Sequence, residues 1–236
     1  TVFDLPLSFF ELVYKLNIQE YFLLRHYLIF LIFFISNIFF FYLLKSNLKN
    51  EKLALLGVFI LITTPRIFSQ SFYNGKDILF LSLMIIATYY CIRLLKKYSF
   101  KNLLLACIFC AFASNIRIIG IYLPILTFIF YFFLENNLKT KKNFHFFILF
   151  FITYFLTLYI IWPFLWLNPV ENLILILKES TSYPNHWNFK ILYLGNYLNP
   201  ENLPWHYFFI WFLSTTPTFF LILIFSGLFI FLKNYL

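Results

Sequence analysis

The segment Ser71-Phe72-Tyr73-Asn74-Gly75-Lys76-Asp77 places a carboxylate directly before a long apolar run. Asp77 is one of two aspartates in a chain that is 62% hydrophobic. A charged side chain at the rim of a membrane helix is costly, so its presence there indicates a function. Asp77 could accept the proton of an attacking hydroxyl group. The structural alternative is that it caps a helix, where the helix dipole also favours a carboxylate.

Three cations stand near the ends of apolar runs, namely Arg66, Lys76 and Arg117. Arg117 lies within Ser114-Asn115-Ile116-Arg117-Ile118-Ile119-Gly120, a tight connection between two such runs. A guanidinium at headgroup depth can hold a phosphate through two parallel hydrogen bonds, and an ammonium can hold one as a point charge. The alternatives are that Lys76 extends from a helix end toward the headgroups and that Arg117 anchors the turn at the interface.

Residues 168–206 are the one long polar segment, and they contain His186 and Trp187. This pair could contact a sugar or position a proton, although a single histidine in a loop is more often inert. The stretch Val170 to Lys178 is apolar enough to lie on a membrane surface as a short helix. We expect a structured loop here.

The three cysteines, Cys91, Cys107 and Cys110, all lie within apolar runs. The spacing of Cys107 and Cys110 is that of redox or metal motifs, but no second pair or nearby histidine completes a site. We therefore predict that they pack as small apolar side chains. No metal ligand set is visible, and the dependence on a divalent metal is open.

The composition predicts an all-α, polytopic integral membrane helix bundle. Only 11% of the residues are charged, and the mean hydropathy is +0.83, values typical of a chain surrounded by lipid. Seven apolar runs are candidate transmembrane helices, at approximately 27–44, 53–64, 78–95, 103–113, 118–134, 146–167 and 207–232. We expect Pro217 to kink the last of these helices.

The charges predict the orientation of these helices. If all seven runs span, the whole net charge of +9 falls on one side. The positive-inside rule assigns that side to the cytoplasm. Basic residues beside helix ends are topology signals, so we predict no nucleic-acid partner. We predict four regions: a tail of an external loop with an interfacial amphipathic helix at 1–22, a six-helix membrane region at 23–167, an external loop at 168–206, and a last transmembrane helix at 207–236.

Several segments together resemble the bacterial membrane glycosyltransferases that are related to protein O-mannosyltransferases and to the lipid A aminoarabinose transferase, in the GT-C superfamily. The resemblance rests on Thr64-Pro65-Arg66-Ile67-Phe68, Phe72-Tyr73-Asn74-Gly75-Lys76-Asp77-Ile78, Ile116-Arg117-Ile118-Ile119-Gly120, Trp162-Pro163-Phe164-Leu165-Trp166-Leu167-Asn168-Pro169, Leu203-Pro204-Trp205-His206-Tyr207 and Ser214-Thr215-Thr216-Pro217. It covers nearly the whole chain.

The resemblance implies an enzyme that transfers a sugar from a polyprenyl-phosphate donor at the extracytoplasmic membrane face. It implies that Asp77 is the acidic residue of the second external loop and that Arg66, Lys76 and Arg117 are candidates for binding the donor phosphate. The first membrane helix and the family's principal catalytic aspartate are expected to precede Thr1. The expected partners are membrane lipids, the polyprenyl-phosphate sugar and an unidentified lipid, glycan or protein acceptor, and the expected location is the bacterial inner membrane.

Two other functions fit parts of the pattern. A transporter or flippase of a lipid-linked substrate would place ionisable residues or broken helices near the middle of the membrane. A structural membrane subunit would leave the external polar residues scattered and solvated. The enzyme hypothesis instead predicts that Asp77 and Arg117 point into one external cavity close to the loop at residues 168–206.

Overall fold

The computed structural model describes residues 1–97, 99–134, 141–181 and 190–235. The chain divides into two compact units, Thr1–Thr181 and Ser182–Leu236. His186 and Trp187 lie outside the described residues, so their predicted role stays a prediction.

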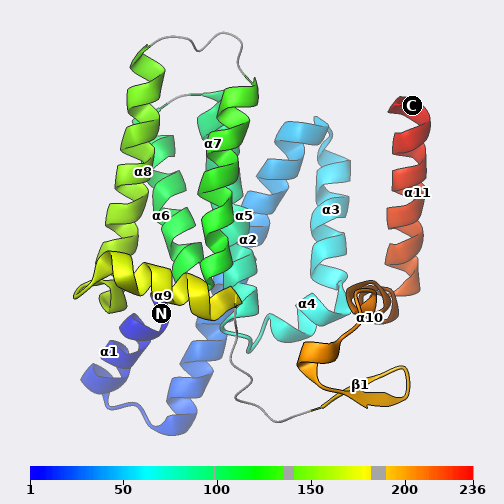
Figure 1. The fold of residues 1–236 in the computed structure, drawn as a ribbon, viewed down its shortest axis with the longest axis horizontal. Helices are drawn as coiled ribbons and strands as arrows, with labels where there is room; N and C mark the ends of the chain where they lie inside the picture. Colours follow the sequence, from blue (N-terminus) through cyan, green and yellow to red (C-terminus); the bar gives the residue numbers. More distant parts are fainter. Residues whose placement is uncertain (98, 135–140, 182–189, 236) are drawn as a thin grey trace. The chain divides into compact units, whose positions relative to one another are not determined.

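The first unit is a bundle of helices that run alternately in opposite directions (Figure 1). Its long members are α2 (Ile18–Leu48), α3 (Glu51–Thr63), α5 (Asp77–Lys96), α6 (Phe100–Ile116), α7 (Tyr122–Leu134) and α8 (Lys141–Ile161). Helix α5 packs against α2, α6 and α7, and α6 packs against α8. Helix α5 therefore lies at the centre of the bundle.

Local sequence signals set where these helices begin. Asn17 and Glu20 form a reciprocal capping box at the start of α2, which satisfies backbone N–H groups that lack partners within the helix. Asn50 and Ser99 cap α3 and α6 in the same way through their side-chain oxygens. The turn between α2 and α3 is therefore short and defined.

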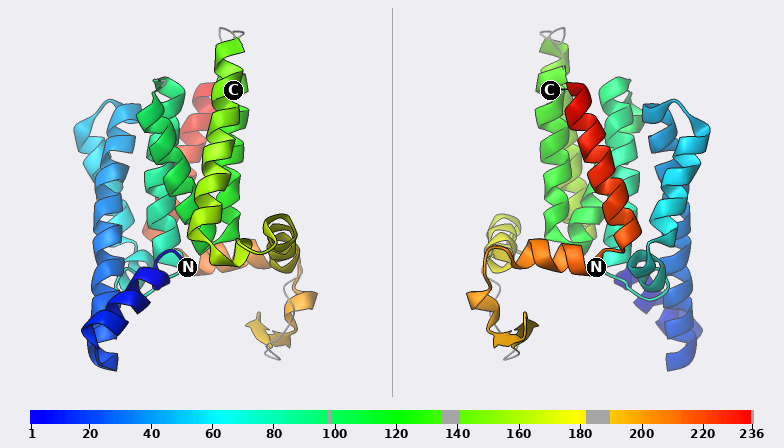
Figure 2. Two further views of the ribbon diagram at one scale, coloured as in Figure 1. Left: turned by 90° about the vertical axis from the view of Figure 1, so that its left-hand side faces the viewer. Right: turned by 90° about the vertical axis from the view of Figure 1, so that its right-hand side faces the viewer.

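The short helices α1 (Asp4–Tyr14), α4 (Pro65–Gln70) and α9 (Pro169–Thr181) all lie at the end of the bundle where α2 and α5 begin (Figure 1). Figure 2 shows α1 inclined beside the first turns of α2. We call this end the Asp77 end. The short helices predicted within residues 1–22 and over Val170–Lys178 are confirmed as α1 and α9.

The opposite end of the bundle carries the cations at the ends of α2 and α5 and at the starts of α3 and α6. We call it the lysine-rich end; its described cations are Lys45, Lys49, Lys52, Arg93, Lys96, Lys97 and Lys101. The segments that the charge pattern assigned to opposite sides therefore do lie at opposite ends of the first unit (Figure 1).

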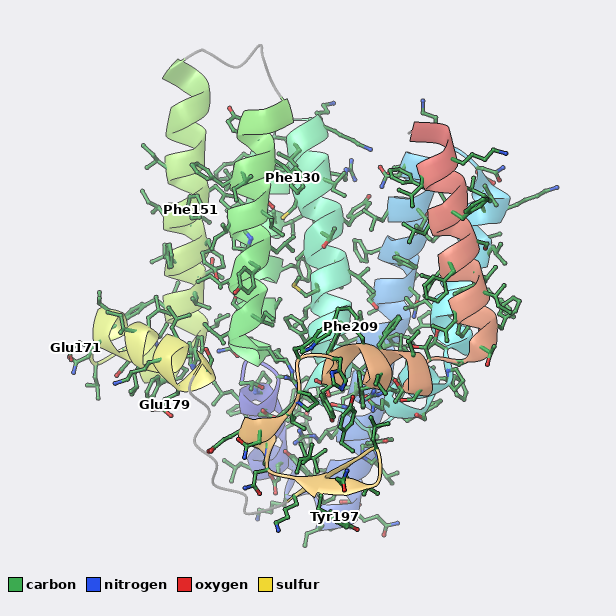
Figure 3. The ribbon with its side chains drawn as sticks, turned by 45° about the vertical axis from the view of Figure 1, so that its right-hand side comes forward. Phe130, Phe151, Glu171, Glu179, Tyr197 and Phe209 are labelled. Carbon is green, nitrogen blue, oxygen red and sulfur yellow. The ribbon has the colours of Figure 1, made fainter. Side chains whose placement is uncertain are left out.

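Helix α9 has the two-sided character expected of a surface helix. Its Leu173 and Ile176 side chains pack against the buried core of the bundle. Glu171 and Glu179 are exposed on α9, away from the Phe130 and Phe151 side chains of the long helices (Figure 3). This arrangement suits a helix that lies across the end of the bundle.

One buried cluster joins α5, α6 and α8 and contains the three cysteines, each at most 2% exposed. The Sγ atoms of Cys91 and Cys110 lie 3.7 Å apart, and Cys107 Sγ contacts the carbonyl oxygen of Phe150 at 3.2 Å. All three cysteines are free thiols. Their predicted role as small packing residues is confirmed.

By length and composition, the part of the chain that the structure describes has fewer helices able to span a membrane than the seven that the sequence predicted. Among the described residues, α2 and α5 alone are long and apolar enough to cross a membrane, and a third span results if α10 and α11 count as one. The apolar runs that form α3 and α6 break early, at Pro65 and Arg117. The 17 residues of α6, for example, reach about 26 Å. The all-α class holds for the first unit, and the count of seven is not confirmed.

The second unit contains a β-hairpin that the all-α prediction missed. Strands β1 (Ile191–Tyr193) and β2 (Asn196–Leu198) pair antiparallel across Leu194 and Gly195, which have φ angles of 47° and 84°. Two left-handed residues are what a two-residue hairpin turn requires. After the 3₁₀ turn η3 (Pro200–Asn202), the last apolar run forms two helices, α10 (Tyr207–Thr215) and α11 (Thr218–Tyr235), bent by 116° at Thr216-Pro217. The predicted kink at Pro217 is confirmed as a full break.

Candidate functional site

Asp77 and Arg117 form an ion pair at the Asp77 end, with Arg117 Nη2 donating to Asp77 Oδ1. Asp77 opens α5 and Arg117 directly follows α6. Their neighbours Ile78 and Ile116 are 3% and 8% exposed and belong to one buried cluster. Because both isoleucines belong to this cluster, the adjacent residues Asp77 and Arg117 lie at the same level of the bundle. The structure thus places Asp77 and Arg117 in contact at one end of the first unit, and the predicted external cavity beside residues 168–206 stays a prediction.

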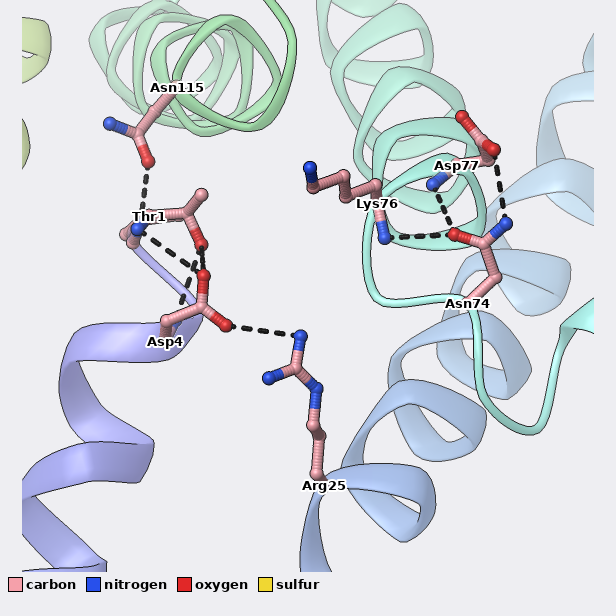
Figure 4. Close-up of polar contacts among 8 residues, drawn as sticks. Thr1, Asp4, Arg25, Asn74, Lys76, Asp77 and Asn115 are labelled. Carbon is pink, nitrogen blue, oxygen red and sulfur yellow. Dashed lines mark hydrogen bonds and ion pairs between the residues drawn. The ribbon is translucent and has the colours of Figure 1, made fainter. Parts of the chain in front are cut away.

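Asn74 holds the Asp77 carboxylate from the other side. Its Oδ1 accepts hydrogen bonds from the backbone N–H groups of Lys76 and Asp77, at 3.0 and 2.8 Å. Its Nδ2 donates to Asp77 Oδ2 at 3.0 Å (Figure 4) and to Gln70 Oε1 at 3.0 Å. The N-cap position of α5 is Lys76, and Asp77 lies in the first turn of the helix, where the helix dipole favours its carboxylate.

Gly120 makes the turn at Arg117 possible. After Arg117 the chain enters the 3₁₀ helix η1 (Ile118–Ile121) and folds back onto the end of α6. A Cβ atom on Gly120 would lie 2.7 Å from the backbone nitrogen of Ser114 and 2.8 Å from the carbonyl carbon of Ala113. Contacts that close with backbone cannot be relieved by a rotamer change. Gly120 therefore fixes where Arg117 leaves the helix.

A second ion pair, Asp4 with Arg25, lies at the same end, with Arg25 Nη2 at 3.3 Å from Asp4 Oδ1 (Figure 4). It joins the start of α1 to α2. Partial burial raises the pKa of the Asp4 carboxyl, but the hydrogen bond from Thr1 and the charge of Arg25 contribute to a net pKa below the ordinary value. Asp4 is therefore held ionised beside its cation at neutral pH.

Arg25 also connects this second pair to the loop that carries Asp77. A Cβ atom on Gly75 would lie 2.9 Å from Arg25 Nη2, so the guanidinium covers this glycine. Asn115, near the end of α6, accepts a hydrogen bond from the backbone N–H of Val2 at 2.6 Å. The sequence interpretation gave no role to Arg25 or Asn115. The signal that could have found Arg25 is its rarity as a charged residue at the start of a long apolar helix.

The other predicted phosphate-binding residues lie on adjoining elements. Lys76 precedes Asp77, and its side chain extends from the start of α5 toward the side where Thr1 and Asn115 lie (Figure 4). Arg66 is exposed on α4 at the same end of the bundle. The structure thus brings Lys76, Asp77 and Arg117 together and places Arg66 on the neighbouring helix.

The exposure of the pair decides what it can do. The side chains of Arg117 and Asp77 are 46% and 52% exposed, so a substrate can reach both. A carboxylate and a guanidinium side by side can accept a proton and neutralise an anion in one place. Within the residues that the structure describes, no group of three or more His, Cys, Asp or Glu side chains could hold a metal ion.

Comparison with known proteins identifies the family. Residues 9–166 match the model of the family described as dolichyl-phosphate-mannose-protein mannosyltransferase. The matched region contains α2 to α8 and both members of the Asp77–Arg117 pair. No curated protein and no solved structure matches the chain. Because the match covers more than half of the sequence, the chain belongs to the dolichyl-phosphate-mannose-protein mannosyltransferase family, a family of membrane glycosyltransferases.

Proposed function

We propose that this protein transfers a sugar from a polyprenyl-phosphate donor to a hydroxyl group of an acceptor at the extracytoplasmic membrane face. The observation that carries the proposal is the ion pair between Asp77 and Arg117, 40 residues apart in sequence and joined at one end of an apolar bundle. In this scheme Asp77 is the general base and Arg117 binds the donor phosphate. A lipid-linked sugar needs such a place, because its tail lies in the bilayer and its reactive carbon lies at the water interface.

The bonds and charges of the transfer step balance with these two groups. The acceptor oxygen bonds to the anomeric carbon while the bond from that carbon to the phosphate oxygen breaks. The bonding electrons leave with the polyprenyl phosphate, whose additional negative charge Arg117 offsets. The acceptor proton passes to a carboxylate oxygen of Asp77.

The ion pair supports an exchange of partners when the donor binds. Without a donor, Asp77 supplies the negative charge beside Arg117. A phosphate can form two parallel hydrogen bonds with a guanidinium, so the donor competes with Asp77 for Arg117. Displaced from Arg117, the carboxylate keeps its contact with Asn74 and faces the acceptor as a base.

Neighbouring cations complete the proposed donor site. Lys76 and Arg66 lie at the same end and add positive charge for the phosphate. His186 and Trp187 remain candidates for contacting the sugar. The orientation rests on the distribution of lysines, which assigns the lysine-rich end to the cytoplasm and the Asp77 end to the opposite side.

One observation favours the alternative function, transport of a lipid-linked substrate. The break between α10 and α11 at Thr216-Pro217 resembles the interrupted helices of transporters. The paired ionisable groups, however, lie at the end of the first unit and are about half exposed, which is the placement expected for interfacial chemistry.

The test is sugar transfer in membrane vesicles that contain the protein, with radiolabelled polyprenyl-phosphate mannose as the first donor. We expect Asp77→Asn to lower the rate by at least about a hundredfold, the usual contribution of a positioned general base. Glu11→Gln is the matched control, because Glu11 is an exposed carboxylate on α1 at the same end. Equal transfer by the Asp77→Asn variant and the wild type would overturn the assignment of Asp77.

A further inference from the structure

The lysine-rich end holds a cavity that the proposed transfer reaction does not use. It lies between the last turns of α2 and α5, has a volume of about 600 Å³, and its cationic lining residues are Lys45, Lys49, Arg93, Lys96 and Lys97. Five cationic side chains at the ends of two helices thus line one cavity. The positive-inside rule accounts for lysines near this end but does not require that they line a common cavity.

The charges in this cavity are largely uncompensated. Among the described residues, the one ion pair that involves this group joins Lys45 to Glu51. Arg93 donates to the Tyr89 hydroxyl at 2.9 Å, with its guanidinium carbon 5.5 Å from the centre of that ring. Lys96 Nζ donates to Asn47 Oδ1 at 3.1 Å. Neutral partners orient Arg93 and Lys96 without cancelling their charges, so both can still bind an anion.

The remaining lining is apolar or amphipathic. Tyr42 and Leu43 on α2 and Ile92 on α5 line the same cavity, and the Tyr42 side chain is 49% exposed. Both helices are apolar enough to span the bilayer, so their charged last turns fall at headgroup level. A ligand that fits has a phosphate for the cations and hydrocarbon for the helix flanks.

We propose that this cavity binds the phosphodiester headgroup of an anionic phospholipid, with the acyl chains along Leu43 and Ile92. Basic pockets between transmembrane helices on the cytoplasmic side are suited to such headgroups. Arg93 and Lys96 are the principal phosphate contacts, and Tyr89 positions Arg93. The lipid site is independent of the transfer chemistry at the other end.

The test measures lipid binding to the purified protein by native mass spectrometry, with phosphatidylglycerol or cardiolipin against phosphatidylcholine. We expect the double variant Arg93→Gln, Lys96→Gln to bind the anionic lipids at least about tenfold more weakly. The control double variant Lys52→Gln, Lys101→Gln removes the same charge from the same end, outside the cavity, and should bind nearly as the wild type does. Equal losses in both double variants would overturn the site, because they would reflect general attraction to a basic end.

Two further measurements, on a Tyr89→Phe variant and with inorganic phosphate as competitor, distinguish the remaining outcomes. Tyr89→Phe removes only the hydroxyl that holds Arg93, so it should weaken anionic lipid binding a few-fold without a change in charge, and it covers the case in which the double variant does not fold. A folded double variant that binds as the wild type does would contradict the proposal, and where the double variant does not fold, an unchanged affinity in Tyr89→Phe would contradict it. Inorganic phosphate should not displace the lipid; displacement by millimolar phosphate would identify a small-anion site instead.

Discussion

The two ends of the first unit use positive charge in opposite ways. At the Asp77 end, Arg117 and Arg25 each pair with a carboxylate, Asp77 and Asp4 respectively. At the lysine-rich end, Arg93 and Lys96 are held by a tyrosine hydroxyl and an asparagine amide. A cation that is paired with a carboxylate can exchange that carboxylate for the phosphate of a substrate. The carboxylate is then available to accept a proton. Charges of one sign attract anions and fix the orientation in the membrane.

The ends also differ in how tightly the backbone holds the charged residues. Arg117 leaves α6 at a turn that the backbone contacts of Gly120 fix, and Asp77 is held by hydrogen bonds with the Asn74 side chain. Lys49 and Lys97 instead follow the last turns of their helices and are exposed. A fixed backbone positions groups for chemistry, whereas exposed helix ends suffice for electrostatic attraction.

The largest difference between the ends should come from exchanging the two charges of the Asp77–Arg117 pair. We expect Asp77→Arg and Arg117→Asp to lower sugar transfer by at least about a hundredfold each, because each removes a group from the reaction. The combined variant restores an ion pair, so it should recover any loss of thermal stability but not the transfer rate. Recovered transfer in the combined variant would mean that the pair is only a structural link.

A smaller effect is expected from Gly120→Ala. The new methyl group would meet the backbone of Ser114 and Ala113, so the turn must move, at a cost of about 1–3 kcal/mol. Arg117 would move with it, and transfer should fall. Gly227→Ala in α11 is the control, since nothing lies within 4 Å of its Cβ position. Thermal unfolding in detergent measures both, and equal stability of the two variants would contradict the role given to Gly120.

The smallest effect should come from Gly75→Ala. Here the methyl group meets the end of the Arg25 side chain at 2.9 Å, and a flexible side chain can move aside for less than about 1 kcal/mol. Thermal unfolding should therefore show a smaller change than for Gly120→Ala. A loss of stability as large as that of Gly120→Ala would contradict this expectation, because it would show that the Arg25 side chain is rigidly held and contributes strongly to the stability of the Asp77 end.

Much of this architecture could be predicted from the sequence because lipid imposes strong patterns. The apolar runs, the basic connections and the break at Pro217 follow from rules that act on one segment at a time. The meeting of Asp77 and Arg117 was predictable because both lie at run ends on the side that the charge pattern left neutral. The seven spans were not confirmed, since apolar content alone does not show where helices such as α3 and α6 stop.

The parts that could not be predicted depend on contacts between distant segments. The Asp4–Arg25 pair joins α1 to α2, and the contact between Arg25 and Gly75 follows from how α2 packs beside the start of α5. The hydrogen bonds from the backbone of Lys76 and Asp77 to Asn74 are local, but the contact between Asn74 Nδ2 and Asp77 depends on the side-chain rotamers. The hairpin at Leu194 and Gly195 was missed because Leu is an unusual residue at a positive φ angle.

The central claim is that Arg117 binds the donor phosphate and Asp77 takes the acceptor proton. The most direct measurement compares donor binding with transfer in Asp77→Asn and Arg117→Ala, using polyprenyl-phosphate mannose and the protein in membrane vesicles. We expect Asp77→Asn to bind the donor at least as well as the wild type and to transfer almost nothing, and Arg117→Ala to bind it at least about tenfold more weakly. Wild-type binding and transfer in both variants would contradict this claim.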